Sequence, residues 1–256
     1  MTDQKARIGI LYPFHSAEDD YPRMAPMVRP RVEMEVVHTT ISEDAHREDA
    51  CLATGDVNRL LEGARELAPK QVDAAMWACT SGSFVYGLDG ARDQVRPVAD
   101  YLGVQVSSTS LAFVSALHFL NIRRVAVAAS YPRDVTLLLK RFLADAGVET
   151  VHLDCLGIIT GVEVALLNQE QVTRFVQSND HPDAEAIVVP DTAMHSAGWV
   201  AGLEEAVDGK PVLTANQVTL WQALQLVGGG TFQVDESMGS LFSDGHAPAA
   251  SRAAGN

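Results

Sequence analysis

Eight short apolar runs recur along the chain, and longer segments with helical spacing separate them. Short β-branched runs that alternate with helical segments predict parallel strands joined by crossover helices. In two of the intervening segments, Asp56 can cap a helix, and another helix is expected to begin at Asp134 and end at Gly147. The eight predicted strands cover residues 8–12, 34–38, 74–78, 104–106, 125–129, 150–153, 186–189 and 211–213.

The eight strands form two sets of four that resemble each other. R-I-G-I-L-Y-P at 7–13 resembles R-V-A-V-A-A-S-Y-P at 124–132, and the third strands match as A-M-W-A-C-T-S and I-V-V-P-D-T-A. Open α/β sheets bind ligands at the carboxyl ends of their strands. If two such sheets face each other, Cys79 and Asp191 lie on opposite walls of one cleft.

We therefore predict an α/β protein of two similar domains, each a four-stranded parallel sheet flanked by helices. The domains are expected to be related by pseudo-two-fold symmetry, with the active site between them. Residues 1–109 should form the first half, joined by 226–243, and residues 110–225 the second half. The small polar residues of 244–256 predict a disordered tail.

Charge and composition exclude several classes of protein. The net charge is −14, with 19 Lys and Arg against 33 Asp and Glu, so nucleic acid is not an expected partner. There is neither an apolar run of about 20 residues nor a secretion signal, which predicts a cytoplasmic protein with no membrane segment. The three widely spaced cysteines and the lack of Cys-x-x-Cys or His-x-x-x-His pairs predict neither disulfides nor a metal site. The oligomeric state cannot be read from the sequence.

Four motifs carry a resemblance to a known superfamily. They are C-T-S-G-S-F-V-Y-G at 79–87, A-A-S-Y-P-R-D-V at 128–135, L-G-I-I-T-G-V-E at 156–163 and L-W-Q-A-L-Q-L-V-G-G-G at 220–230. Together and in this order they resemble the aspartate/glutamate racemase superfamily. Within it the chain is most similar to the arylmalonate decarboxylases, with the maleate isomerases as near relatives, over nearly all residues up to about 243.

The resemblance implies cofactor-independent chemistry at the carbon next to a carboxylate. Relatives generate an enolate-like carbanion with cysteines that follow the two third strands, while hydrogen-bond donors hold the carboxylate. By motif match, those donors are Thr80, Ser81, Tyr131 and the backbone amides around Asp191 and Thr192. The implied partner is a small carboxylate.

The chain departs from its relatives at the two cysteine positions. The decarboxylases have glycine first and cysteine second, and the isomerases and many racemases have cysteine at both, whereas this chain has Cys79 and Asp191. A helix N-terminus at Cys79 is expected to favour its thiolate; the alternative is a buried packing residue. Asp191 is a base, a proton donor, a group that sets the protonation of Cys79, or only the N-cap of the helix that carries Trp199.

The remaining candidates have structural alternatives too. Thr80 and Ser81 can instead cap a helix that begins near Gly82, and Tyr131 can pack against Pro132. His15 is a candidate substrate contact, because it stands where many isomerases have a polar loop. Cys51 and Cys155 match no catalytic position and are predicted to be packing residues.

Three functions remain open. The first is decarboxylation of a substituted malonate, with Cys79 delivering a proton from the face opposite to that used by the decarboxylases. The second is isomerisation or racemisation by Cys79 and Asp191. The third is a non-catalytic protein that binds a small carboxylate.

Overall fold

Two parallel four-stranded sheets form the framework of the protein. The computed structural model describes residues 5–228 and 232–243. The sheets have the orders β3-β1-β4-β5 and β7-β6-β8-β9, which is the same order counted from the start of each half. The predicted fold class and all eight predicted strands are confirmed. The strands are β1 (Ala6–Pro13), β3 (Val32–Thr39), β4 (Ala74–Trp77), β5 (Gln105–Ser108), β6 (Arg124–Ala129), β7 (Glu149–Cys155), β8 (Ala186–Val189) and β9 (Val212–Thr214).

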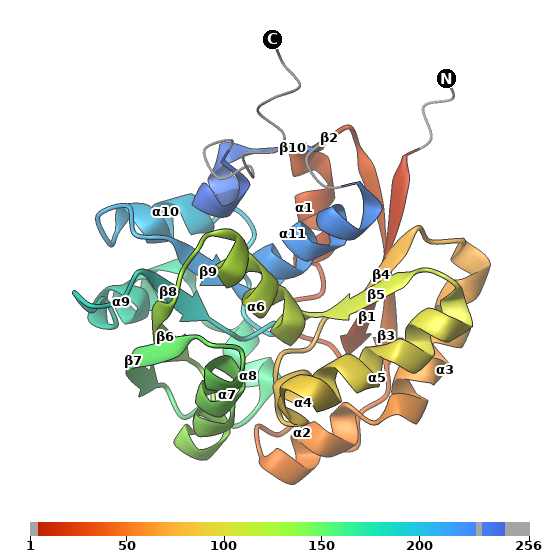
Figure 1. Cartoon of the computed structure of the whole chain (residues 1–256), viewed down its shortest axis with the longest axis horizontal. Coiled ribbons are helices and arrows are strands. Elements are labelled where there is room, and N and C mark those ends of the chain that lie inside the picture. Colours follow the sequence, from red (N-terminus) through yellow and green to blue (C-terminus); the bar gives the residue numbers. More distant parts are fainter. Residues whose placement is uncertain (1–4, 229–231, 244–256) are drawn as a thin grey trace.

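Helices cover both sheets, and two of them lie between the sheets (Figure 1). A short antiparallel pair, β2 (Val28–Arg29) and β10 (Gln233–Val234), joins residues far apart in the sequence. The helices are α1 (Asp20–Met24), α2 (Glu48–Thr54), α3 (Val57–Leu67), α4 (Ser81–Phe84), α5 (Gly87–Leu102), α6 (Thr109–Phe119), α7 (Arg133–Asp145), α8 (Gly161–Ala165), α9 (Gln169–Ser178), α10 (Val200–Glu205) and α11 (Ala215–Val227). Short 3-10 helices occupy residues 25–27, 68–70, 236–238 and 240–242.

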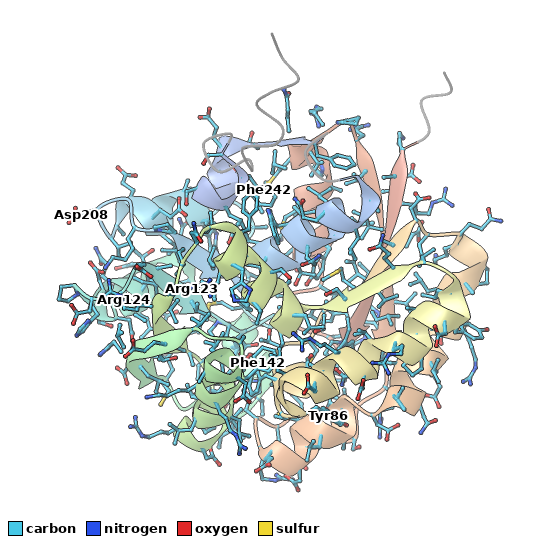
Figure 2. The ribbon with its side chains drawn as sticks, in the orientation of Figure 1. Tyr86, Arg123, Arg124, Phe142, Asp208 and Phe242 are labelled. Carbon is cyan, nitrogen blue, oxygen red and sulfur yellow. The ribbon has the colours of Figure 1, made fainter. Side chains whose placement is uncertain are left out.

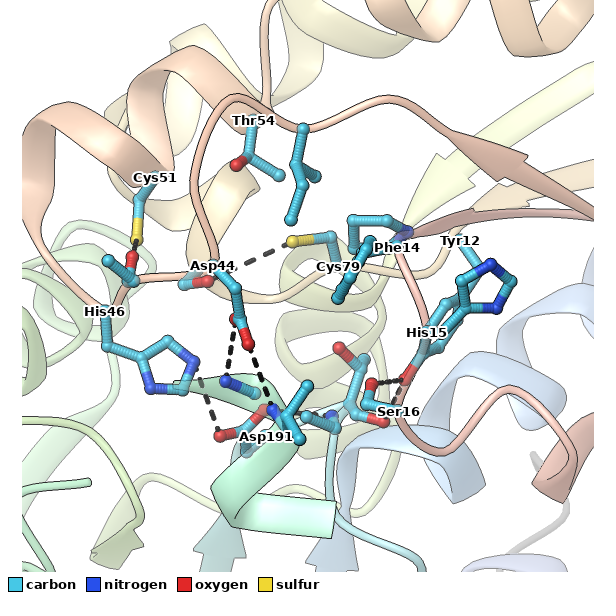
Figure 3. A pocket seen from close by; sticks show the side chains of 18 of the residues that line it. Tyr12, Phe14, His15, Ser16, Asp44, His46, Cys51, Thr54, Cys79 and Asp191 are labelled. Carbon is cyan, nitrogen blue, oxygen red and sulfur yellow. Dashed lines mark hydrogen bonds and ion pairs between the residues drawn. The ribbon is translucent and has the colours of Figure 1, made fainter. Parts of the chain in front are cut away.

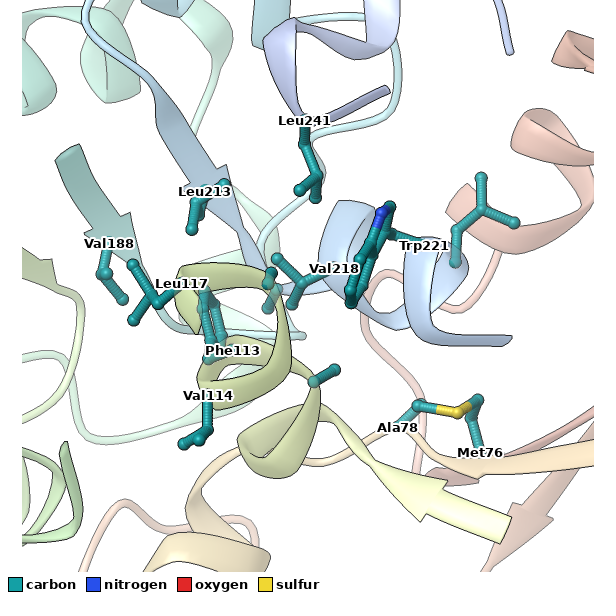
Figure 4. Packing of buried hydrophobic residues seen from close by; sticks show 14 of the residues in the cluster. Met76, Ala78, Phe113, Val114, Leu117, Val188, Leu213, Val218, Trp221 and Leu241 are labelled. Atoms are coloured by element: carbon teal, nitrogen blue, oxygen red, sulfur yellow. The ribbon is translucent and has the colours of Figure 1, made fainter. Parts of the chain in front are cut away.

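The central core joins the two halves through α6 and α11. Successive strand residues point to opposite faces of a sheet, so Val125 and Val127 face this core while Ala126 and Ala128 face a second cluster under α9. Phe113 of α6 and Trp221 of α11 belong to the central cluster (Figure 4). Both helices carry apolar side chains on most sides, because the rest of the protein surrounds each of them. Their packing against both halves holds the two sheets in a fixed arrangement.

The caps show how local sequence positions the helices. The Asp56 carboxylate accepts a hydrogen bond from the Asn58 amide and caps α3 as predicted. The predicted start of α7 at Asp134 is one residue late, because the helix begins at Arg133 with Pro132 as its N-cap. The fixed φ of proline suits the start of a helix. The helix ends before Gly147, whose φ of +78° is left-handed.

Charged side chains gather on the periphery and aromatic ones fill the interior. Arg124 and Asp208 are exposed, whereas Phe142 is buried in the core (Figure 2). Across residues 5–228 and 232–243, no helix has the length and apolarity that a membrane-spanning helix needs. The predicted tail, residues 244–256, lies outside the described residues.

Candidate active site

A cavity lies at the carboxyl ends of the strands, with residues of both sequence halves in its lining (Figure 3). About 510 Å³ of empty space lies between these residues when the solvent at the open mouth is counted, and the enclosed part is narrow, at about 60 Å³. The loops after β1, β3 and β4 supply one wall, and those after β7 and β8 supply the other. Five predicted site residues line it: His15, Cys79, Ser81, Asp191 and Thr192.

Cys79 follows β4, and its side chain is almost completely buried. The residue is 4% exposed, and its Sγ accepts a hydrogen bond from the Gly82 amide at 3.3 Å. A Cβ at Gly82 would lie 3.0 Å from that sulfur, so glycine allows the close approach. Burial raises the pKa of the thiol from 9.0 to about 12 and outweighs the amide hydrogen bond.

The expectation that a helix N-terminus favours the Cys79 thiolate is therefore wrong. α4 has only four residues, Ser81–Phe84, so few aligned peptide dipoles act on the sulfur. Loss of water around the thiol is the larger effect. Cys79 is thus a neutral thiol at physiological pH.

Asp191 follows β8 and is surrounded by hydrogen-bond donors. It is 4% exposed, its Oδ1 accepts from the Ala193 amide at 2.9 Å, and its Oδ2 accepts from the Ser130 hydroxyl. The alternative role of Asp191 as N-cap of α10 is wrong, because Trp199 occupies the N-cap position of that helix. Both oxygens of Asp191 act as acceptors in this arrangement.

His46 is a cavity residue that the sequence did not reveal. Its Nε2 lies 3.8 Å from Asp191 Oδ2, and 9% of its side chain is exposed. Its Nδ1 lies 3.0 Å from the Ile158 carbonyl oxygen, and its ring packs edge-on against Tyr131. A proton on Nδ1 donates to that carbonyl, which leaves Nε2 facing the carboxylate.

Two predicted donors, Thr80 and Tyr131, do not belong to the cavity lining. The Tyr131 hydroxyl donates to the Pro190 carbonyl at 2.9 Å, and burial raises its pKa well above the usual value. Thr80 is fully buried, and its hydroxyl oxygen has no hydrogen-bond partner among the described residues. It precedes α4 but makes no side-chain cap.

Cys51 lines the same cavity as Cys79, although the sequence predicted only a packing residue there. It lies on α2, and burial raises the pKa of its thiol to about 11. Cys155, at the end of β7, is half-buried and is not part of this lining. The first half thus lines the cavity with two thiols and with the carboxylates of Glu43 and Asp44, and the second half contributes the Asp191 carboxylate.

A loop of the first half reaches across the cavity. Asp44 accepts hydrogen bonds from the Gly161 and Val162 amides at 2.8 and 3.1 Å, where α8 begins. The His46 amide donates to the Ile159 carbonyl in the same stretch of the second half. These contacts place His46 over Asp191, and no local motif in 40–47 indicates them.

Apolar side chains stand at the rim of the cavity. Phe14, Ile41 and Val162 contribute to its lining, and Phe14 and Val162 are largely exposed. Phe14 has a φ of +58°, a strained backbone conformation for a residue with a side chain. Strain of this kind concentrates at functional sites, and here it belongs to the loop that presents Phe14 to the cavity.

Solved structures of two kinds of enzyme share this fold. A maleate isomerase from Pseudomonas putida S16 with maleate aligns with a TM-score of 0.85 at 22% identity, over 94% of this chain and 98% of that one. A second match is a liganded double mutant of arylmalonate decarboxylase, in which a glycine is changed to cysteine and a cysteine to serine. It aligns with a TM-score of 0.83 at 21% identity, over 94% of this chain and 100% of that one.

Sequence comparison identifies the same two kinds of enzyme. The chain is 27% identical to arylmalonate decarboxylase of Bordetella bronchiseptica, over 73% of this chain and 78% of that protein. It is 26% identical to a maleate isomerase of Pseudomonas putida, over 63% of this chain and 67% of that protein. The family model described as arylmalonate decarboxylase matches residues 21–242. The chain therefore belongs to the arylmalonate decarboxylase family, within the superfamily that its motifs indicated.

Proposed function

We propose that the protein is a cofactor-independent decarboxylase of malonates that carry an apolar substituent, with Cys79 as the proton donor. The observation that carries this proposal is the neutral Cys79 thiol, whose pKa burial raises to about 12, in the lining of a cavity to which both halves of the chain contribute. A thiol of this kind is a poor nucleophile but holds a proton for a carbanion formed beside it. The apolar rim of Phe14, Ile41 and Val162 supports an apolar substituent on the substrate.

The reaction balances without a cofactor. The bond between the α-carbon and one carboxylate breaks, carbon dioxide leaves, and the electron pair remains as an enediolate on the α-carbon and the second carboxylate. The Cys79 S–H proton then moves to the α-carbon, and the resulting thiolate recovers a proton from water. Ser81 and the Thr192 amide, which belong to residues of the cavity lining, are the proposed contacts of the retained carboxylate, and His15 is a proposed contact at the mouth.

Asp191 raises a charge problem that His46 resolves. A carboxylate on the second wall would repel an anionic malonate. The His46 Nε2 lies 3.8 Å from Asp191 Oδ2, and both side chains line the cavity. We assign Asp191 the role of holding the loop that carries Thr192, through its hydrogen bond with the Ala193 amide, and His46 the role of offsetting the negative charge.

The test is decarboxylation of an aryl-methylmalonate, whose product is chiral. Release of carbon dioxide should accompany formation of one enantiomer, measured by chiral chromatography. Since Cys79 stands where the decarboxylases have glycine, the product should have the hand opposite to theirs. A racemic or same-handed product from active enzyme would contradict the assignment of Cys79 as donor.

A double variant makes the test sharper. Cys79→Gly with Asp191→Cys moves the thiol to the second wall, which is the arrangement that the resemblance implies for the decarboxylases. Any activity of this variant should give the other enantiomer. Cys155→Ser is the matched control and should retain the product hand of the parent enzyme, because Cys155 is not part of the cavity lining.

Maleate isomerisation is the second candidate, and Cys79 itself favours it, because the isomerases have a cysteine at this position. A solved maleate cis-trans isomerase of Nocardia farcinica carries a covalently bound succinylcysteine intermediate. Conversion of maleate to fumarate, or exchange of an α-proton in heavy water without release of carbon dioxide, would replace the decarboxylase assignment. Binding of aryl-methylmalonate and of maleate without turnover would instead indicate a carboxylate-binding protein.

A further inference from the structure

Two histidines and a glutamate converge at the mouth of the cavity. His15 and Glu18 lie in the loop after β1, and His38 lies near the end of β3, opposite Tyr12 in the strand register. Glu18 Oε1 lies 2.8 Å from His15 Nδ1 and 3.3 Å from His38 Nε2. The three ligand atoms all lie within 4.8 Å of one another.

These distances are close to those between neighbouring ligand atoms around a single metal ion. Zinc binds imidazole nitrogens and carboxylate oxygens at about 2.0–2.2 Å, so neighbouring ligand atoms in a tetrahedral site lie about 3.3 Å apart. The two imidazole rings lie 4.0 Å apart between centroids and tilt by 41°, with both nitrogens directed at one carboxylate oxygen. One central cation would satisfy all three ligands, whereas two protonated rings at this distance would repel each other.

The surroundings hold the carboxylate in position for this role. The Ser16 amide donates to Glu18 Oε2 at 2.7 Å, which orients the carboxylate and leaves Oε1 toward the histidines. Contacts of this kind to the second oxygen of a metal-binding carboxylate are a regular feature of metal sites. The side chains remain partly open to solvent, at 63% for His15, 23% for Glu18 and 38% for His38, so a cation has access.

We propose that His15, Glu18 and His38 form a site for a divalent transition metal such as zinc at the mouth of the cavity. Two nitrogen ligands favour zinc, nickel or copper over magnesium or calcium, which prefer oxygen. Three protein ligands leave a coordination position open, as in sites that bind a small molecule and unlike closed structural sites. His15 also lines the cavity, so the open position adjoins the space proposed for the substrate.

No sequence motif indicates this site, because its ligands come from two separate strand ends. The expectation of no metal rested on short ligand spacings, and His38 stands 20 residues beyond Glu18. Parallel pairing of β1 with β3 brings the two segments together. Zinc binding is measured without substrate, so its outcome does not depend on the proposed decarboxylation.

A second group of possible ligands provides a control. Asp19, Asp20 and His195 also lie within 4.8 Å of one another. However, Asp20 Oδ2 already accepts hydrogen bonds from the Ser196 and Ala197 amides and from the Asn216 side chain. Asp20 is therefore engaged in holding the first half to the second, and we expect no metal there.

The experiment is titration of the full chain, without a histidine tag, with zinc chloride by isothermal calorimetry. One equivalent should bind, and cobalt at the same site should give the visible absorption of a tetrahedral complex. His15→Ala, His38→Ala and Glu18→Gln should each weaken zinc binding at least about tenfold. His195→Ala and His152→Ala are the matched controls and should bind zinc as the parent does.

Three outcomes would overturn the proposal. They are no zinc binding by the parent chain, binding that survives both His15→Ala and His38→Ala, and binding lost in a control variant. Circular dichroism of each variant checks that it is folded, and because His15 and His38 lie on different segments, one folded variant is enough to decide. Magnesium should produce no heat of binding, and magnesium binding at the same residues would contradict the assigned ligand chemistry.

Discussion

Cys79 and Asp191 occupy equivalent places in two halves with the same strand order, and their surroundings differ. The thiol receives an amide hydrogen bond at 3.3 Å and lies 4.0 Å from the Ser81 hydroxyl, and burial raises its pKa to about 12. The carboxylate receives a hydroxyl and an amide, and a histidine of the other half lies 3.8 Å away. The two halves thus place Cys79 and Asp191 at equivalent positions, while the residues around each side chain determine its protonation state and its chemistry.

Removing the Cys79 thiol is the strongest test of this difference. If that thiol delivers the proton, Cys79→Ala should reduce decarboxylation by about 10³- to 10⁴-fold, because a positioned general acid contributes up to that factor. Initial rates of carbon dioxide release measure the effect. Cys155→Ser is the control, and a Cys79→Ala enzyme that keeps more than a tenth of its activity would assign the proton to another group.

The reactivity of Cys79 tests its protonation directly. A pKa of about 12 in place of 9.0 makes its thiolate about a thousandfold scarcer at pH 8 than that of an ordinary cysteine, so iodoacetamide should modify it about a thousandfold more slowly. Since the thiolate fraction grows as pH rises toward 12, the rate should increase about tenfold per pH unit from pH 7 to 10. Peptide mapping by mass spectrometry resolves Cys79 from Cys51 and Cys155. Rapid modification of Cys79 at pH 7 would show a thiolate and favour the isomerase alternative.

Asp191→Asn tests the role of the carboxylate on the opposite wall of the cavity. The amide has nearly the shape of the carboxylate, but its NH₂ group cannot accept a hydrogen bond, so one of the donors, Ser130 or Ala193, loses its partner. We expect kcat/KM for the malonate to fall by about a hundredfold, because an unpaired donor disturbs the loop that carries Thr192 into the cavity lining. The product hand should stay the same. A reversed or racemic product would mean that Asp191 itself handles the proton.

The sequence was sufficient for the framework but not for the environment of the site. Strand and helix signals are local, so the order of elements and the match of Cys79 to Asp191 could be predicted from residues alone. The pKa of Cys79 could not, because burial depends on how α2 and α4 pack around the sulfur. His46 was missed for a similar reason, since it reaches Asp191 only through the contacts of Asp44 with α8.

His46→Gln should have the smallest effect of the four. The 3.8 Å between His46 Nε2 and Asp191 is too long for a hydrogen bond, so we assign His46 an electrostatic role in binding the anionic substrate. Such a role acts on the bound substrate and the transition state alike, which predicts a KM about tenfold higher with kcat little changed.

The matched control for His46 is His118→Gln, an exposed histidine of α6 that bonds the Ala146 carbonyl and is not part of the cavity lining. It should leave both constants unchanged. If His46→Gln instead lowers kcat at constant KM, then His46 moves a proton in the transition state. Acid–base chemistry would then come from His46 as well as Cys79, and the contrast between a proton-donating Cys79 and a charge-balancing pair of His46 and Asp191 would have to be abandoned.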